Sequence, residues 1–169
     1  MGENNTSSAD QVFISGLYNT ASAVNASALG FGSTADAVFI SGLYNTASAV
    51  NASALGFGSK TTGENSLAMG RLSVASGKSS FAGGGAYTPD NTTASGDYSF
   101  AFGYATIASR ASSVSLGTRN KATGVSSIAM GDSGEANGNN SISLGVANKT
   151  QANYSIALGG NNETGLTGS

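Results

Sequence analysis

The chain has 169 residues, a net charge of −2 and only 9% charged side chains, so it is long enough for one ordinary domain or one modest repeat array. It contains neither Cys nor His, which excludes disulfides, thiolate metal sites and histidine-based catalysis. The seven basic residues form no cluster, so we expect no nucleic-acid partner. No segment approaches the roughly 20 apolar residues of a spanning helix, so we expect no membrane contact by this part.

A glycine that ends a short apolar motif recurs every 14 residues along most of the chain. The spacing differs twice, being 12 residues between Gly30 and Gly42 and 19 residues between Gly84 and Gly103. Such a fixed period is the signature of a repeat architecture, and eleven coils fit one register. The motif glycines are Gly16, Gly30, Gly42, Gly56, Gly70, Gly84, Gly103, Gly117, Gly131, Gly145 and Gly159.

Each period is predicted to contain two short strands. The residues before the glycine alternate in size, as in Ile128-Ala129-Met130, and a second strand of small residues follows around Ala122 or Thr150. A glycine in every motif opposes a helix, so the pattern predicts an all-β parallel solenoid, or β-roll, of about eleven coils.

We expect the larger residue of each alternating pair to fill the interior. The small-residue face would then be flat and uncharged, which suits close contact with identical chains. The expected interior residues are Leu67, Met69, Phe100, Phe102, Val114, Leu116, Ile128, Met130, Ile142, Leu144, Ile156 and Leu158, and the expected outward ones are Ala68, Ala82, Ala101, Ala129 and Ala157.

The domain organisation is predicted to be simple. Residues 1–9 are interpreted as an N-terminal extension, and residues 10–169 as a single repeat domain with a loop insertion near 85–92. Gly85 and Pro89 are turn formers, and Pro cannot donate to an interior strand ladder, so the five extra residues should bulge out of the stack.

No catalytic, cofactor-binding or metal-binding residues are predicted. The many serines have no histidine base to activate them, and the nine carboxylates are scattered. Asp132 and Glu135 flank a turn, but calcium takes six to eight oxygen ligands, so solvated turn charges are the favoured interpretation. We therefore expect no enzyme and no cofactor.

Aromatic residues outside the alternating motif are the candidate ligand contacts. They follow motif glycines or lie in the insertion, and exposed aromatics are enriched in binding hot spots. The alternative is that they cap the edge of the roll or pack between subunits. The candidates are Tyr18, Phe31, Tyr44, Phe57 and Tyr87.

The recurring motif resembles the head domain of YadA-like trimeric autotransporter adhesins. The resemblance rests on SLAMG (66–70), SFAFG (99–103), SVSLG (113–117), SIAMG (127–131), SISLG (141–145) and SIALG (155–159). It implies a left-handed parallel β-roll, a homotrimer, and display outside a bacterial cell through a stalk and an outer-membrane anchor that this sequence lacks. It further implies that this head fragment attaches to host matrix proteins, cell-surface receptors or other surfaces.

The alternative function is a non-adhesive structural solenoid, such as a segment of a phage tail fibre. A chaperone or receptor-binding tip in place of a membrane anchor would distinguish that class. An ice-binding roll needs a regular array of Thr, and the Thr residues here form no column.

Overall fold

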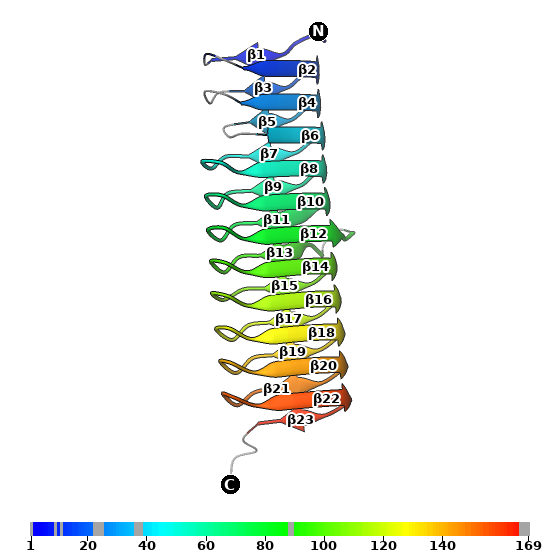
Figure 1. The fold of residues 1–169 in the computed structure, drawn as a ribbon. Coiled ribbons are helices and arrows are strands. Elements are labelled where there is room, and N and C mark those ends of the chain that lie inside the picture. Colours follow the sequence, from blue (N-terminus) through cyan, green and yellow to red (C-terminus); the bar gives the residue numbers. More distant parts are fainter. Residues whose placement is uncertain are drawn as a thin grey trace.

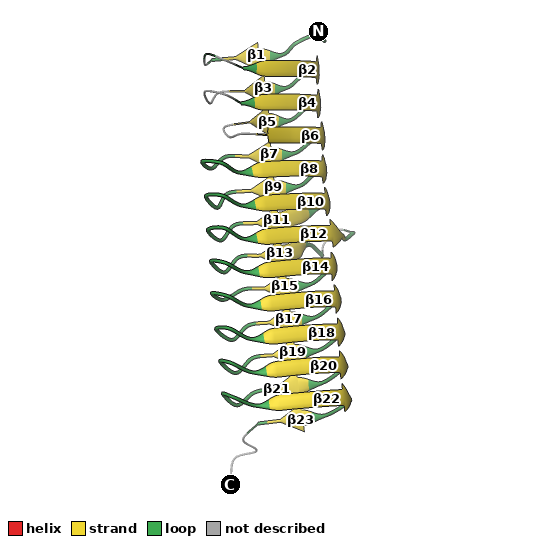
Figure 2. Cartoon of the chain, in the orientation of Figure 1, coloured by secondary structure: helices red, strands yellow, loops and turns green. Residues whose placement is uncertain are grey.

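A computed structural model describes residues 2–8, 10, 12–21, 26–35, 39–87 and 90–165, which form one elongated stack of β-coils (Figure 1). The chain runs from the N-terminus at one end of the stack to the C-terminus at the other. Two parallel sheets run along the stack, and turns join them at both edges (Figure 2). None of the described residues forms a helix, so none is in a helix that could cross a membrane.

The strands of the motif form an 11-stranded sheet. They are β2 (Phe13–Leu17), β4 (Ser27–Phe31), β6 (Phe39–Leu43), β8 (Ser53–Phe57), β10 (Leu67–Arg71), β12 (Phe81–Gly85), β14 (Phe100–Tyr104), β16 (Val114–Thr118), β18 (Ile128–Asp132), β20 (Ile142–Val146) and β22 (Ile156–Gly160).

The shorter strands form a 12-stranded sheet. They are β1 (Thr6–Ser7), β3 (Thr20–Ala21), β5 (Thr34–Ala35), β7 (Thr46–Ala47), β9 (Lys60–Thr61), β11 (Ser73–Ala75), β13 (Thr92–Ala94), β15 (Ile107–Ala108), β17 (Lys121–Ala122), β19 (Glu135–Ala136), β21 (Lys149–Thr150) and β23 (Glu163–Thr164).

The strand register confirms the parallel solenoid predicted from the repeat. Motif glycines lie opposite one another along the whole 11-stranded sheet, and both irregular intervals keep this register, with Gly30 opposite Gly42 and Gly84 opposite Gly103. β1 pairs with β3, so the 12-stranded sheet reaches into the predicted extension, residues 1–9. The boundary at residue 10 stays a prediction.

The assignment of the two strand faces was wrong. The small residues Ala68, Ala82, Ala101 and Ala129 are fully buried between the sheets, whereas Phe102 is 50% exposed on the opposite face. Ala157 is buried in the same way, and Met69, Met130, Ile156 and Leu158 are exposed. The large residues therefore line the outside of a single chain.

The second strand explains why the interior selects small side chains. Its inward residues are also small, such as Ala122 and Ala136, and they pack against Ala129 in one cluster. Two facing columns of alanine leave no room for Phe or Met, so the larger half of each alternating pair must point outward. Ile40 is the largest fully buried side chain among the described residues, and Ser41 takes the outward position after it.

Buried asparagines link successive coils by hydrogen bonds. Each of them lies three residues after a motif glycine. Asn120 Nδ2 donates to the carbonyl oxygens of Leu116 and Gly131, both at 2.6 Å. Its Oδ1 accepts from the Gly134 backbone nitrogen of the next coil at 2.7 Å. The same arrangement recurs at Asn19, Asn45 and Asn148.

Replacing Asn120 by alanine is expected to lower the free energy of unfolding by about 2–4 kcal/mol, because it leaves buried backbone groups of two coils without partners. Thermal unfolding followed by circular dichroism measures the change. Asn162→Ala is the matched control, since Asn162 is exposed and its side-chain amide donates only to Leu158 O within its own coil. Equal melting temperatures for the two variants would show that the hydrogen bonds of the Asn120 side chain contribute nothing to stability.

The insertion leaves both sheets continuous. β11 pairs directly with β13, bringing Ser73 opposite Thr92, so the extra residues lie between Gly85 and Thr92. The Asp90 backbone nitrogen donates to Tyr87 O at 2.9 Å across the turn. Residue 89, the predicted turn-forming Pro, lies outside the described residues. The insertion emerges at the edge of the stack where the strands of the 11-stranded sheet end (Figure 1).

Candidate functional site

The outward side of the 11-stranded sheet is a largely apolar surface, called here the apolar face, and in its first four coils each apolar residue is accompanied by an outward serine: Ser15, Ser27, Ser41 or Ser53. It consists of two columns of side chains, three positions and one position before each motif glycine, and it carries no charge. Its columns include Leu67, Met69, Phe81, Phe100, Phe102, Val114, Leu116, Ile128, Met130, Ile142, Leu144, Ile156 and Leu158.

Aromatic rings pack against one another in the middle of the apolar face. Phe81 stacks on Phe100 with ring centroids 4.8 Å apart, and Phe102 lies 6.3 Å from Phe81. Gly83 makes room for them, because a Cβ there would lie 2.7 Å from the Phe102 ring. Apolar surface of this length on an uncomplexed chain is typical of an interaction site.

The outward side of the 12-stranded sheet has the opposite character and is called here the polar face. One side chain per coil points outward, and three of the charged ones pair across strands: Glu135 lies 3.7 Å from Lys121 and 3.9 Å from Lys149. Exposed pairs of this kind contribute little to stability. The polar-face column is Thr20, Thr34, Thr46, Lys60, Val74, Thr93, Ile107, Lys121, Glu135, Lys149 and Glu163. Thr6, Thr20, Thr34 and Thr46 stack on successive coils, so the expectation that the Thr residues form no column was wrong for this stretch.

A row of aromatic side chains runs along the edge formed by the glycine turns. Tyr18, Phe31, Tyr44 and Phe57 meet edge to face, with successive ring centroids 5.5, 5.5 and 5.8 Å apart. Tyr18 and Tyr44 adopt a left-handed backbone conformation with φ of 56°, which directs the chain around the turn.

Two arginines extend this row, Arg71 before the insertion in the sequence and Arg119 after it. The Arg71 guanidinium lies 5.8 Å from the Phe57 ring centroid and 4.2 Å from the Tyr87 ring centroid, within cation–π range. Tyr87 is 6.5 Å from Tyr104, and Arg119 lies 5.6 Å over Tyr104. The whole set, called here the edge row, is Tyr18, Phe31, Tyr44, Phe57, Arg71, Tyr87, Tyr104 and Arg119.

The model of the YadA head domain repeat matches most of the chain. The matched segments are residues 21–39, 47–73, 62–85, 90–106, 94–120, 108–133 and 136–162. The chain belongs to the YadA head family. No curated protein shows significant similarity to the chain.

The family assignment confirms the resemblance inferred from the motifs. YadA heads belong to trimeric autotransporter adhesins, which are exposed on the cell surface, and a β-solenoid head is typically not an enzyme. The matches stop at residue 85 and resume at residue 90, so residues 86–89 of the insertion lie outside the repeat pattern. Among the described residues, no three acidic side chains gather into a cluster that could hold a metal ion.

All five aromatics selected from the sequence lie in the edge row of this YadA head. Tyr18, Tyr44, Phe57 and Tyr87 are each more than 40% exposed, so they contact one another and still present surface to solvent. The sequence analysis did not select Arg71, Tyr104 or Arg119 as contacts. Arg71 and Tyr104 directly follow motif glycines, as Phe31 and Phe57 do, and that shared position is the signal that could have found them.

Proposed function

We propose that the chain is the left-handed β-roll head of a bacterial surface adhesin, assembled as a homotrimer through its apolar face. Residues 10–169 would form one repeat domain, displayed outside the outer membrane by a stalk and an anchor. Its targets would be host matrix proteins, cell-surface receptors or other surfaces. The three copies are implied by the family, and the choice of face follows from the contrast between the two sheets.

That contrast is the observation that carries the proposal. The apolar face holds large uncharged side chains over successive coils, whereas the polar face carries Thr, Lys and Glu at every outward position except Val74 and Ile107. A face that remained in water would leave Phe102 and Leu158 half exposed or more, which opposes solubility. Burying it against two other copies removes this surface from water, at roughly 25 cal/mol per Å².

This arrangement replaces the contact expected from the sequence. The small-residue face cannot join the subunits because it is already buried between the two sheets of one chain. The polar face then points away from the trimer axis, and the head offers three identical copies of it. Repeated weak contacts of this kind yield strong attachment through multivalency.

The edge row supplies the proposed adhesive contacts. Beads coated with the head are expected to attach to immobilised matrix proteins or to host cells, and a Tyr44→Ser/Tyr87→Ser double variant should attach several-fold less. Each lost aromatic contact is expected to reduce affinity about five-fold, since about 1 kcal/mol per contact is typical.

Tyr154→Ser is the matched control, because Tyr154 is 78% exposed on the turn after β21 and makes no ring contact with the described residues. Its beads should attach like the parent. If the double variant also attaches like the parent, the edge-row side chains only pack against one another and make no adhesive contact. If the parent attaches to no matrix protein or cell type, the adhesin proposal is contradicted.

A further inference from the structure

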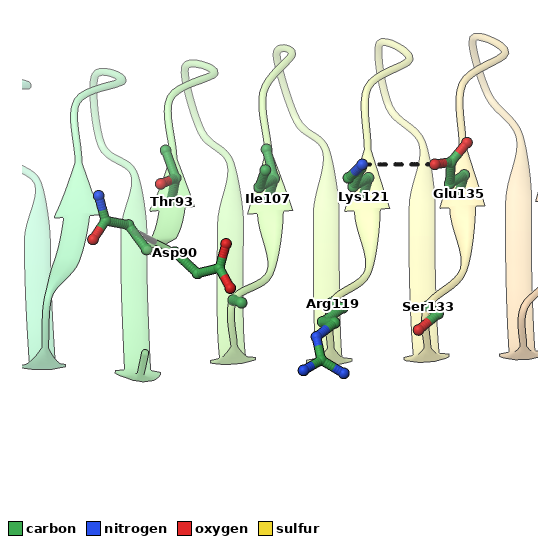
Figure 3. A pocket seen from close by; sticks show the side chains of 9 residues that line it. Asp90, Thr93, Ile107, Arg119, Lys121, Ser133 and Glu135 are labelled. Carbon is green, nitrogen blue, oxygen red and sulfur yellow. Dashed lines mark ion pairs between the residues drawn. The ribbon is translucent and has the colours of Figure 1, made fainter. Parts of the chain in front are cut away.

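A groove of about 570 Å³ lies where the insertion meets the polar face (Figure 3). Thr93, Ile107, Lys121 and Glu135 form one side of it, in a row over β13, β15, β17 and β19. The volume is within the range of about 300–1,000 Å³ that small-molecule sites occupy. We call this groove the outer trough.

The repeat itself explains the shape of the outer trough. The side chain three residues after each motif glycine points inward, as buried Asn120 does, so only backbone lies between Arg119 and Lys121. Arg119 and Ser133 flank the trough on the turn side. Asp90, from the insertion, lies at one end of it (Figure 3), and the adjacent Asn91 also lines it.

The base of the insertion is fixed by hydrogen bonds. In the amide orientation that satisfies its neighbours, Asn91 Nδ2 donates to Leu72 O at 3.3 Å and to Asp90 O at 3.0 Å. The Ala86 backbone nitrogen donates to Arg71 O at 3.2 Å. The polar groups at this end of the trough are therefore held by a coil of the stack.

The charges in the trough are of both signs and incompletely paired. Arg119 stacks over Tyr104 and has no carboxylate within ion-pair distance among the described residues, and the same holds for Asp90 and cations. Glu135 is shared between Lys121 and a second lysine, so Lys121 is only partly neutralised. Lys121 lies in the row on one side of the trough and is turned toward Glu135, whereas Arg119 lies on the turn side with its guanidinium turned away from that row (Figure 3). Acidic or amide acceptors lie toward both ends.

We propose that the outer trough binds a sugar chain that carries a carboxylate, an inference that rests on the adhesin function. Rotation of the exposed Arg119 side chain away from the Tyr104 ring would bring its guanidinium over the trough, where it would hold the carboxylate through paired hydrogen bonds, with Lys121 on the opposite side. The Asp90 carboxylate and Asn91 Oδ1 would accept hydrogen bonds from sugar hydroxyls, because Asn91 Nδ2 already donates to Leu72 O and Asp90 O. Polyanions such as acidic peptides fit less well, because Asp90 and Glu135 repel additional negative charges.

The test measures binding of purified head to 3′-sialyllactose and to lactose by isothermal titration calorimetry or saturation-transfer NMR. The parent should bind sialyllactose about ten-fold more tightly than lactose, and Arg119→Gln should remove that preference, as expected for loss of a charged hydrogen bond. Asp90→Asn should weaken both sugars. Arg110→Gln is the matched control, because Arg110 is exposed at the opposite edge and should leave both affinities unchanged.

A hexaglutamate peptide is the third probe, and it should bind more weakly than sialyllactose. Equal or tighter binding of hexaglutamate would overturn the sugar assignment. So would equal binding of the two sugars, or loss of the preference in Arg110→Gln alone. If no sugar binds while head-coated beads still attach to cells, the trough proposal fails and the adhesin proposal stands.

Discussion

Replacing Gly117 by alanine should lower the free energy of unfolding by about 3 kcal/mol or more, through backbone strain and overpacking together. Gly117 has a φ of +112°, which L side chains rarely adopt, and an added Cβ would lie 2.1 Å from Gly131 O of the next coil. Neither coil can move away, because both are paired on their other sides. The melting temperature should fall by on the order of 10 °C.

Gly85→Ala is the matched control for this prediction. Gly85 belongs to the same sheet, but its φ is not positive, and the nearest heavy atom to an added Cβ is Arg71 Cβ at 3.9 Å. Its melting temperature should stay within about 2 °C of the parent, because a surface change of this size alters stability by at most a few tenths of a kcal/mol. A similar fall for both variants would contradict the close approach of backbones at the motif glycines.

Replacing Leu144 by aspartate is expected to abolish the trimer. Leu144 lies on the apolar face between Met130 and Leu158 of the neighbouring strands. In the proposed assembly each aspartate would be buried against other copies without a partner, which costs several kcal/mol per carboxylate and is repeated in every subunit. Size-exclusion chromatography with light scattering should show monomer or aggregate in place of a trimer.

Val125→Asp introduces the same charge at a turn on the opposite edge, where Val125 is 43% exposed. This control should remain trimeric. A trimeric Leu144→Asp head would mean that the apolar face does not join the subunits. Loss of the trimer in both variants would point to general destabilisation by the added charge.

The repeat, the strands and their register followed from the sequence, because the glycine spacing directly encodes which residues stack. Which face of each strand points inward did not follow from the sequence. Strand alternation separates Ala129 from Met130 but does not say which of them points inward. The rule that large apolar residues fill the interior assumes one chain with its own core, whereas here the larger residues are on the outside of each coil. The alanines of the second strand, such as Ala122, were the available evidence for a thin interior.

The individual candidate contact residues could be predicted from the sequence, but their arrangement in one continuous row could not. Phe31 and Phe57 were selected because they lie outside the alternating motif, directly after motif glycines, yet their contacts with Tyr18, Tyr44 and Arg71 depend on neighbouring coils. The outer trough was not predicted at all. It combines the insertion with turn and strand residues of three later coils, and no spacing in the sequence marks that combination.

The central claim is that three chains assemble through the apolar face, and sedimentation equilibrium of the unmodified protein tests it most directly. The mass should be three times that of the 16.5 kDa chain, with no folded monomer at micromolar concentration. A well-folded single chain at that concentration, with the apolar face in water, would contradict the claim.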